Sequence, residues 1–378
     1  MPTPTSNRGT SVLFLIDHLD TGGAPVVVRD LIKGMHQAGV QVTLVVLSER
    51  VSHELPEGVE LVTLPLVMNT RAERRQRYAR HAALLNDWLN GWLEQQHSSR
   101  FQLVLAHLHH THQVVSRSHL ASQAWYCLHS DPVTEFLGGR NLVGRWAKRF
   151  KVRALYDRRR IVTVSQGMLE RLSSAFNVNP AEGVAIYNPL DVDRITALSS
   201  QRVVDVPPDY LLFVGRVGAR QKRVDRLLAA YQESRLEIPL LLIGGGELSE
   251  VSSLINSMGL TDKVWVLGAR DNPYVYMSQA RALVLSSDYE GFPLVLLEAL
   301  ACGTPVVSVD CPTGPSELLT GELRDFLVPM DDIQAFANAL QRVVDHPPAV
   351  PMDIAEQYGL ESVVARYLAL AEPHSEQR

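Results

Sequence analysis

Two carboxylates with a turn between them form the stretch of this sequence best suited to chemistry. Glu290 lies in a predicted loop, and Glu298 lies within the apolar helix that follows a turn containing Gly291 and Pro293. Such a loop directs free backbone N–H groups and the positive end of the helix dipole at one point, where a phosphate can bind. Carboxylates that flank this point can accept hydrogen bonds from sugar hydroxyls. An anion site lined by such acceptors suggests a nucleotide sugar as ligand.

Two cations follow the first predicted strand of the second half of the chain. Arg216 comes directly after the strand predicted at 210–214, and Lys222 lies six residues later. The planar fork of an arginine and the point charge of a lysine suit phosphate oxygens in different positions, and together they would neutralise a diphosphate leaving group. Arg220 and Arg223 are equally basic, so surface charges are the alternative. The position at a strand end favours a role in binding.

Two glycines and a histidine of the first half of the chain fall where a parallel sheet binds ligands. Gly22 and Gly23 follow an apolar run at 11–16 and precede a helical pattern. Open α/β sheets bind ligands at the carboxyl ends of their strands, which is where this turn lies. The full dinucleotide fingerprint is absent, so an ordinary tight turn is the alternative. His129 ends another strand, predicted at 124–128, and is expected in the same crevice.

Four more histidines gather after the strand predicted at 103–106, and a metal site is one interpretation of them. They are His107, His109, His110 and His112. Their spacing repeats no known ligand pattern, so we predict no metal and expect histidines at the surface or between domains. The three cysteines, Cys127, Cys302 and Cys311, lie far apart. This usage fits a reducing cytoplasm.

The order of apolar segments predicts an α/β fold with two Rossmann-like domains and parallel sheets. A chain of 378 residues is too long for one ordinary core. Strand and helix patterns alternate until the run Asn188 to Asp191 breaks them, and they resume at Tyr210. We predict an N-terminal domain at 1–190, a linker at 191–205, a C-terminal domain at 206–353 and a terminal helix at 354–378.

Composition excludes several classes of protein. The formal net charge of −5 argues against a dedicated nucleic-acid binder. The polar start of the chain, Met1 to Thr10, lacks the apolar core of a signal peptide. No apolar run approaches the roughly 18 to 20 residues that cross a bilayer. We therefore expect a cytoplasmic protein whose membrane contact, if any, is peripheral.

One segment is basic enough to make such a contact. Residues 140–160 hold nine lysines and arginines against one acid, Asp157, with Trp146, Phe150 and Tyr156 interleaved. A basic helix with apolar residues on its other side is typical of segments that lie on anionic lipid. The alternative is a solvated helix that covers its own domain.

Residues 290–299 resemble the E-x7-E signature of retaining GT-B glycosyltransferases, in particular glycosyltransferase family 4. The continuation, 301–307 and 310–317, is similar to the subset that builds bacterial surface polysaccharide and lipopolysaccharide. The resemblance covers nearly the whole chain. Its other motifs lie at 22–24, 164–165, 188–189, 213–216 and 221–223.

The resemblance implies a role for each residue of the second half. Arg216 and Lys222 hold the donor diphosphate, Glu298 holds the ribose and Glu290 holds hydroxyls of the transferred sugar. The backbone that contacts sugar and phosphates is that of Gly291, Phe292, Pro293 and Leu294. These roles rest on the likeness to the family and not on spacing alone.

The same resemblance assigns residues of the first half. Gly22 and Gly23 approach the diphosphate or the acceptor from the opposite domain, and His129 resembles the histidine beside the reacting sugar. Two positions depart from the common pattern: Pro25 stands where many relatives have an acid, and the gap from Arg216 to Lys222 is one residue longer than usual.

The resemblance implies transfer of a hexose or N-acetylhexosamine from a nucleotide diphosphate sugar, with retention of the anomeric configuration. Among the nucleotide sugars, a UDP-sugar is the donor that we expect. The acceptor is a lipopolysaccharide core or a lipid-linked glycan at the inner face of the cytoplasmic membrane. The fold implied is GT-B, with a central cleft and a terminal helix that crosses back to the first domain. No metal is required, because the cations and the helix N-terminus replace it. The alternatives are a nucleotide-sugar isomerase of the same fold and a binding scaffold without turnover.

Overall fold

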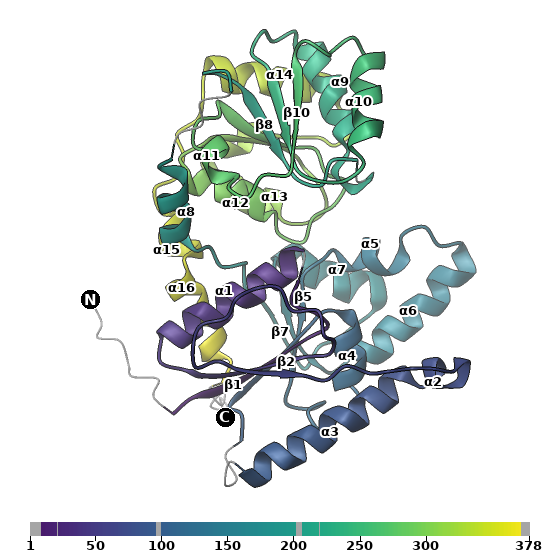
Figure 1. Ribbon diagram of the computed structural model, residues 1–378. Coiled ribbons are helices and arrows are strands. Elements are labelled where there is room, and N and C mark those ends of the chain that lie inside the picture. The colour runs from purple at the N-terminus through teal and green to yellow at the C-terminus, as the bar shows by residue number, and fades with distance from the viewer. Residues whose placement is uncertain (1–8, 21, 96–99, 202–205, 219, 372–378) are drawn as a thin grey trace, which may run out of the picture. The chain divides into compact units, whose positions relative to one another are not determined.

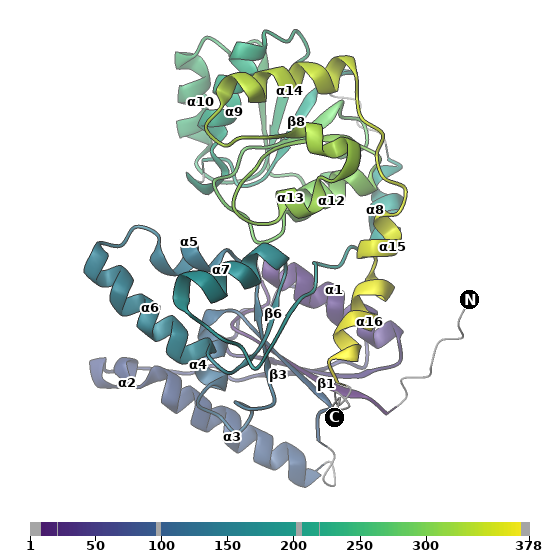
Figure 2. The ribbon, with the colours of Figure 1, turned by 180° about the vertical axis from the view of Figure 1, so that it is seen from behind.

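The computed structural model describes residues 9–20, 22–95, 100–201, 206–218 and 220–371 (Figure 1). Contacts within the chain divide it into two compact units. The N-terminal unit comprises Met1–Pro189 and Leu360–Arg378, and the C-terminal unit comprises Leu190–Gly359. Each unit is a parallel sheet covered by helices, as Figures 1 and 2 show. The predicted α/β fold with two Rossmann-like domains is confirmed.

The N-terminal unit has a seven-stranded parallel sheet in the order β3-β2-β1-β4-β5-β6-β7. Its strands are β1 (Ser11–Ile16), β2 (Gln41–Val46), β3 (Glu60–Thr63), β4 (Leu103–His107), β5 (Trp125–Leu128), β6 (Arg160–Thr163) and β7 (Glu182–Ala185). Its helices are α1 (Gly23–Gln37), α2 (Arg71–Arg75), α3 (Arg77–Gln95), α4 (His109–Val115), α5 (Pro132–Leu137), α6 (Leu142–Tyr156), α7 (Gln166–Phe176) and α16 (Leu360–Ala369). All six residues of β1 are buried, as expected for a central strand covered on both faces.

The C-terminal unit has a six-stranded parallel sheet in the order β10-β9-β8-β11-β12-β13. Its strands are β8 (Leu211–Val214), β9 (Leu240–Ile243), β10 (Val264–Gly268), β11 (Ala282–Leu285), β12 (Val306–Val309) and β13 (Leu327–Val328). Its helices are α8 (Val192–Ser199), η1 (Arg220–Lys222), α9 (Val224–Ser234), α10 (Leu248–Ser257), α11 (Tyr274–Met277), α12 (Leu294–Ala301), α13 (Pro315–Leu318), η2 (Gly321–Phe326), α14 (Ile333–Asp345) and α15 (Ile354–Tyr358). Strand order reverses between β8 and β11, so the loops after these two strands meet at one edge of the sheet.

The end of the chain differs from the single helix predicted at 354–378. The structure breaks it at Gly359, which pairs with Leu190 in a short parallel bridge. The first part, α15, packs against α12 in the C-terminal unit, and the second, α16, packs against α1 in the N-terminal unit. Gly34 allows this approach, because a Cβ there would lie 2.7 Å from Val364 Cγ2. The return of the terminal helix to the first domain is confirmed for α16, and residues 372–378 lie outside the described residues.

The range predicted as a linker, 191–205, contains a helix. Helix α8 packs against α11 and α12, and its Ile195 is buried. Asp191 caps the helix by accepting a hydrogen bond from the backbone N–H of Arg194. Residues 191–201 are therefore part of the C-terminal unit, while 202–205 lie outside the described residues.

Two glycines hold the loop after β9 against the loop after β8. Gly244 and Gly246 have φ of 144° and 126°, which side chains rarely adopt. A Cβ on Gly244 would lie 1.8 Å from the carbonyl oxygen of Gly215, and one on Gly246 would lie 2.2 Å from that of Val217. The glycine run at 244–246 thus admits the chain's own backbone, on either side of Arg216.

We expect Gly244→Ala to lower the free energy of unfolding by about 2–4 kcal/mol, because the φ angle is strained for alanine and a methyl group would clash with the Gly215 carbonyl oxygen. Urea denaturation of the full chain, followed by circular dichroism, measures this. Gly245→Ala is the matched control, since a Cβ there meets nothing within 4 Å. Equal midpoints for the two variants would contradict the packing role of Gly244.

Candidate functional site

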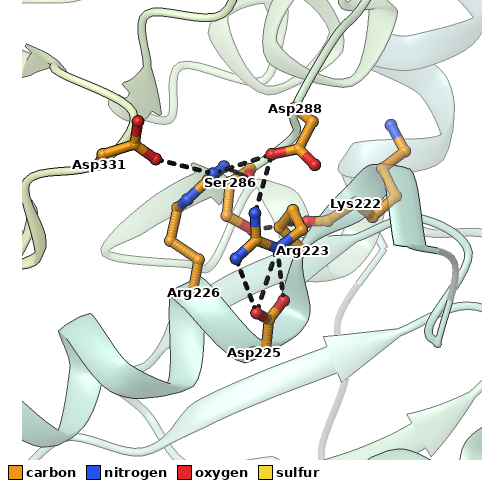
Figure 3. Close-up of polar contacts among 7 residues, drawn as sticks. All are labelled: Lys222, Arg223, Asp225, Arg226, Ser286, Asp288 and Asp331. Carbon is orange, nitrogen blue, oxygen red and sulfur yellow. Dashed lines mark hydrogen bonds and ion pairs between the residues drawn. The ribbon is translucent and has the colours of Figure 1, made fainter. Parts of the chain in front are cut away.

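A cluster of ion pairs joins the two segments that follow β8 and β11 at the carboxyl end of the C-terminal sheet. The guanidinium of Arg226 donates to the carbonyl oxygen of Ser286 and to Oδ1 of Asp288, both at 2.8 Å. Arg223 donates to the same Asp288 oxygen at 3.1 Å and to Asp225 at 2.8 Å (Figure 3). The side chain of Arg226 is only 3% exposed, whereas that of its partner Asp288 is 37% exposed. The segment after β8 is thereby fixed to the segment after β11.

Next to this cluster, two of the predicted site residues pair with each other. Lys222 Nζ lies 2.8 Å from Glu290 Oε1, and the side chains are 15% and 11% exposed. The backbone of Lys222 is held as well, because its carbonyl accepts a hydrogen bond from the Ser286 hydroxyl at 2.7 Å. Sequence reasoning gave the two residues separate ligand contacts and missed the ion pair. Because 68 residues separate them, no local pattern could have found it.

The backbone around Glu290 is held by three residues to which no role had been assigned. The Gln221 side chain donates to the carbonyl of Tyr289 at 2.8 Å. The buried Thr313 hydroxyl donates to the carbonyl of Glu290. Gly314, at φ 93°, leaves no room for a Cβ, which would lie 2.6 Å from Pro293 Cδ. Gln221, Thr313 and Gly314 all fall within motifs that carry the family resemblance, which was the one signal available.

Helix α12 presents its N-terminus beside this pair. Pro293 is the N-cap, and no side chain caps the helix, so its first N–H groups have no side-chain acceptor. Phe292 packs its ring against Tyr358 at 5.7 Å between centroids. The turn at Gly291, Phe292 and Pro293 is buried, and Leu294 is half-buried. This is the geometry expected of an anion-binding helix start.

Glu298 and Arg216 are the other two residues predicted to bind the sugar donor. One carboxylate oxygen of Glu298 accepts a hydrogen bond from the Tyr274 hydroxyl at 3.0 Å, and the side chain is half-buried one turn into α12. Arg216 is exposed at the end of β8, with a long contact of 3.5 Å to Gln221 Oε1. The structure thus brings Arg216, Lys222, Glu290 and the start of α12 to one edge of the sheet.

In the N-terminal unit, Gly22 and Gly23 form the start of α1. Gly22 is the N-cap with φ 114°, a conformation that favours glycine, and no side chain caps the helix. A Cβ added to Gly23 would meet nothing within 4 Å, so the backbone here is open. Gly22 and Gly23 are both exposed, so the backbone at the start of α1 is accessible to a ligand.

His129 follows β5 and is paired with a buried neighbour. Its Nε2 lies 2.9 Å from Nδ1 of His107, and the two rings stack at 5.2 Å between centroids. Burial lowers the pKa of His129 to about 4, and burial together with the neighbouring imidazoles of His129 and His112 lowers that of His107 well below its usual range. Both rings are neutral near pH 7, so one donates and the other accepts. Within the described residues, His129 Nδ1 has no hydrogen-bond partner.

The other histidines are linked by hydrogen bonds. His112 contacts the Tyr156 hydroxyl and the Ala106 carbonyl, each at 2.9 Å, and burial lowers its pKa to about 3. Nε2 of His110 lies 3.0 Å from Nδ1 of His81. In the part of the chain that the structure describes, no three His, Cys, Asp or Glu side chains are grouped so that they could hold a metal ion. Sequence reasoning had placed these histidines at the surface or between domains, and the structure instead buries His107 and His112.

Two family models match this chain. Residues 21–194 match the model described as Glycosyltransferase Family 4, and residues 208–346 match the model described as Glycosyl transferases group 1. Together with the two parallel sheets, these matches support a GT-B glycosyltransferase.

Curated relatives match over part of their length. A Campylobacter jejuni enzyme, N-acetylgalactosamine-N,N'-diacetylbacillosaminyl-diphospho-undecaprenol 4-alpha-N-acetylgalactosaminyltransferase, is 30% identical over 199 residues, which are 52% of this chain and 54% of that protein. The lipopolysaccharide 1,6-galactosyltransferase of Salmonella typhimurium is 29% identical over 189 residues, 48% and 52% of the two chains. This chain spans about half the length of the curated relatives it matches.

Solved structures resemble the chain over nearly its full length. Sucrose-phosphate synthase from Thermosynechococcus elongatus has a TM-score of 0.73 and 20% identity, covering 95% of this chain and 98% of that one. HepE of Anabaena, in complex with UDP and glucose, has a TM-score of 0.72 and 16% identity over the same shares. At these identities the likeness establishes the fold.

The buried histidines predict how stability depends on pH. In the unfolded chain, histidine binds a proton near its ordinary pKa of 6.5, whereas folded His129 stays neutral until about pH 4. The unfolded state therefore binds more protons between these values, and stability is lost as pH falls through this window. We expect His129→Asn to reduce that loss by about 1–3 kcal/mol in urea denaturation at two pH values. The exposed control His119→Asn should keep the wild-type dependence; a wild-type dependence in His129→Asn would contradict the prediction.

Proposed function

Taking the chain as a GT-B glycosyltransferase, we propose that it transfers a hexose or N-acetylhexosamine from a nucleotide diphosphate sugar, with a UDP-sugar as the donor. The configuration at the anomeric carbon is retained. The observation that carries the proposal is the ion pair of Lys222 and Glu290, whose side chains are 15% and 11% exposed, beside the start of α12, which no side chain caps. A cation, a carboxylate and free N–H groups at one point suit a sugar joined to a diphosphate.

The ion pair suggests how the donor is held. When a diphosphate reaches the start of α12, the Lys222 ammonium, which has three donors, can bind a phosphate oxygen and keep its bond to Glu290. The second carboxylate oxygen of Glu290 then accepts from a sugar hydroxyl. Arg216, exposed and nearby, adds its charge to the leaving diphosphate. In the ligand-free protein, Lys222 and Glu290 neutralise each other, which limits the cost of burying either charge.

The transfer step needs no general base from the protein in this proposal. As the bond from the anomeric carbon to the phosphate oxygen breaks, that oxygen takes the proton of the acceptor hydroxyl on the same face of the sugar. The acceptor oxygen forms the new bond to the anomeric carbon, so the configuration is retained. Arg216, Lys222 and the N–H groups of α12 stabilise the charge that develops on the diphosphate. The cations and the helix start take the place of a metal.

His129 contributes a neutral group. Burial keeps its pKa at about 4, so near pH 7 the ring offers a hydrogen bond and not a positive charge. Hydrogen bonding to a sugar hydroxyl suits such a ring, whereas neutralising a phosphate does not. We therefore assign the charge of the diphosphate to residues of the C-terminal unit and a hydroxyl contact to His129.

The proposed acceptor is a lipid-linked glycan or a lipopolysaccharide core. The Campylobacter relative is named for a diphospho-undecaprenol acceptor and the Salmonella relative for lipopolysaccharide. Helix α6 supports a peripheral membrane contact, because one side of it exposes large apolar side chains. They are Leu142, Val143, Trp146 and Phe150, with exposures of 84%, 76%, 71% and 69%. Among the described helices, none is long and apolar enough to cross a membrane.

We expect Glu290→Ala and Lys222→Ala to lower the rate of sugar transfer by roughly 100-fold or more, since each removes a charge that faces the reacting diphosphate sugar. Arg220→Ala, in the same short helix η1 as Lys222, is the control and should stay within about twofold. Glu290→Gln keeps the shape of the site and should lose most activity if the carboxylate is needed.

A panel of nucleotide sugars, tested by thermal shift and then with a glycan acceptor, measures these effects. Wild-type transfer by the Glu290 and Lys222 variants would exclude the assigned site. Conversion of the donor without any acceptor would instead indicate the isomerase, and nucleotide binding without turnover would indicate a scaffold.

The double variant Trp146→Ser/Phe150→Ser should weaken sedimentation with vesicles of anionic lipid by about tenfold or more, because two exposed aromatic side chains lose their burial in the bilayer. Met352→Ser, which changes an exposed apolar side chain of the C-terminal unit, is the control. Unchanged sedimentation of the double variant would remove α6 as the membrane contact.

A further inference from the structure

A cavity in the N-terminal unit lies between α3, α4 and α6 and is lined by an excess of cations. Its volume is about 630 Å³. Five permanently basic side chains line it, namely Arg77, Arg117, Lys148, Lys151 and Arg159. His109 lines it as well, and the other lining residues are uncharged. Cavities of this size hold small organic ligands.

The five cations have no carboxylate partners within the described residues. Arg77 donates to the Tyr78 hydroxyl at 2.6 Å, Arg117 to the Gln113 carbonyl at 2.6 Å, and Arg159 to the Ala121 carbonyl at 2.7 Å. These partners orient the guanidinium groups but carry no net charge. The acid that acts on Lys148 is Glu135, which does not line the cavity. The charge of the lining therefore remains largely uncompensated.

The pKa values of two lining groups reflect the same excess of positive charge. Burial lowers the pKa of His109 to about 4, and the nearby charges of Lys148 and Arg77 act in the same direction. Burial and the neighbouring cations Arg140 and Lys151 lower the pKa of Lys148. Each group is thus destabilised in its charged form by its surroundings, a state that a bound anion would relieve.

The geometry favours an anion with several oxygens. The Tyr78 ring lies under two guanidinium groups, with Arg77 at 4.5 Å and Arg117 at 5.5 Å from its centroid, which holds both on one wall. Lys148 and Lys151, three residues apart, lie on one face of α6 and line the same cavity. Arginine forks and lysine ammonium groups together are the usual means of binding phosphate oxygens.

We propose that this cavity binds a phosphate or diphosphate group. Resting on the proposed function, we assign that group to the acceptor, so that the carrier of a lipid-linked glycan is held by its phosphates while its hydrocarbon lies along the exposed apolar side of α6. The volume exceeds that of a single phosphate and leaves room for a sugar attached to it. The cavity would then select acceptors that carry phosphate.

Binding of inorganic diphosphate to the full chain tests the cavity without any transfer assay. Calorimetry in the Arg216→Ala/Lys222→Ala background weakens binding at the proposed donor site, so that the cavity can be measured separately. Arg117→Gln/Lys151→Gln should weaken binding by about tenfold or more. The matched control is Arg149→Gln/Arg153→Gln, which removes the same charge from exposed positions of α6 that do not line the cavity. Equal affinities for the two double variants, both shown to be folded by circular dichroism, would overturn the proposal.

The source of the phosphate is tested separately. With the Arg216 and Lys222 side chains intact, the cavity variant should raise the KM for a phosphate-bearing acceptor about tenfold and leave the KM for the donor unchanged. Its sedimentation with phosphatidylglycerol vesicles should equal that of the control double variant. A selective loss of vesicle binding with an unchanged acceptor KM would show a bilayer headgroup and overturn the assignment to the acceptor. If no acceptor supports transfer, the proposed function fails, while the diphosphate measurement still decides the cavity.

Discussion

The C-terminal unit depends on one buried guanidinium. Arg226 has little exposure to water, and removing such a charge from water is costly unless it is paired and hydrogen-bonded. Its bonds to Ser286 and Asp288 meet that requirement, and in doing so they fix the start of α9, directly after the loop that carries Lys222, to the loop after β11. Lys222 and Glu290, at the ends of these loops, are therefore presented to each other by a contact that touches neither. The site is positioned by its neighbours before any ligand arrives.

The sequence predicted the parts of this protein that depend on local pattern. Apolar runs such as 11–16 and 124–128 predicted buried strands, and their alternation with helices predicted parallel sheets. Gly22 and Pro293 indicated helix starts because few residues suit those positions. The roles of Arg216, Lys222, Glu290 and Glu298 came from a resemblance and stay predictions, since their positions in one unit are known but their ligands are not.

What the sequence could not predict depends on contacts distant in the chain. The bond of Lys222 to Glu290 and that of Thr313 to the Glu290 backbone require the folded sheet edge. The lowered pKa values of His107 and His129 arise because β4 and β5 pair side by side in the folded sheet. The terminal helix is broken at Gly359 by a bridge to Leu190, which helical propensity near the chain end does not reveal. The cationic cavity likewise draws its arginines and lysines from α3, from α6 and from the turns that follow α4 and α6.

The packing of α16 against α1 has a consequence for the order of synthesis. The N-terminal unit takes its last helix from residues 360–369, after the whole of the C-terminal unit. On the ribosome, α1 and its Gly34 surface are made early and wait for their partner until all 170 residues of Leu190–Gly359 have been translated. At about 5–20 residues per second this interval lasts on the order of ten seconds or more. During it the surface of α1 around Gly34 is open to chaperones, and the second domain can fold before the first is complete.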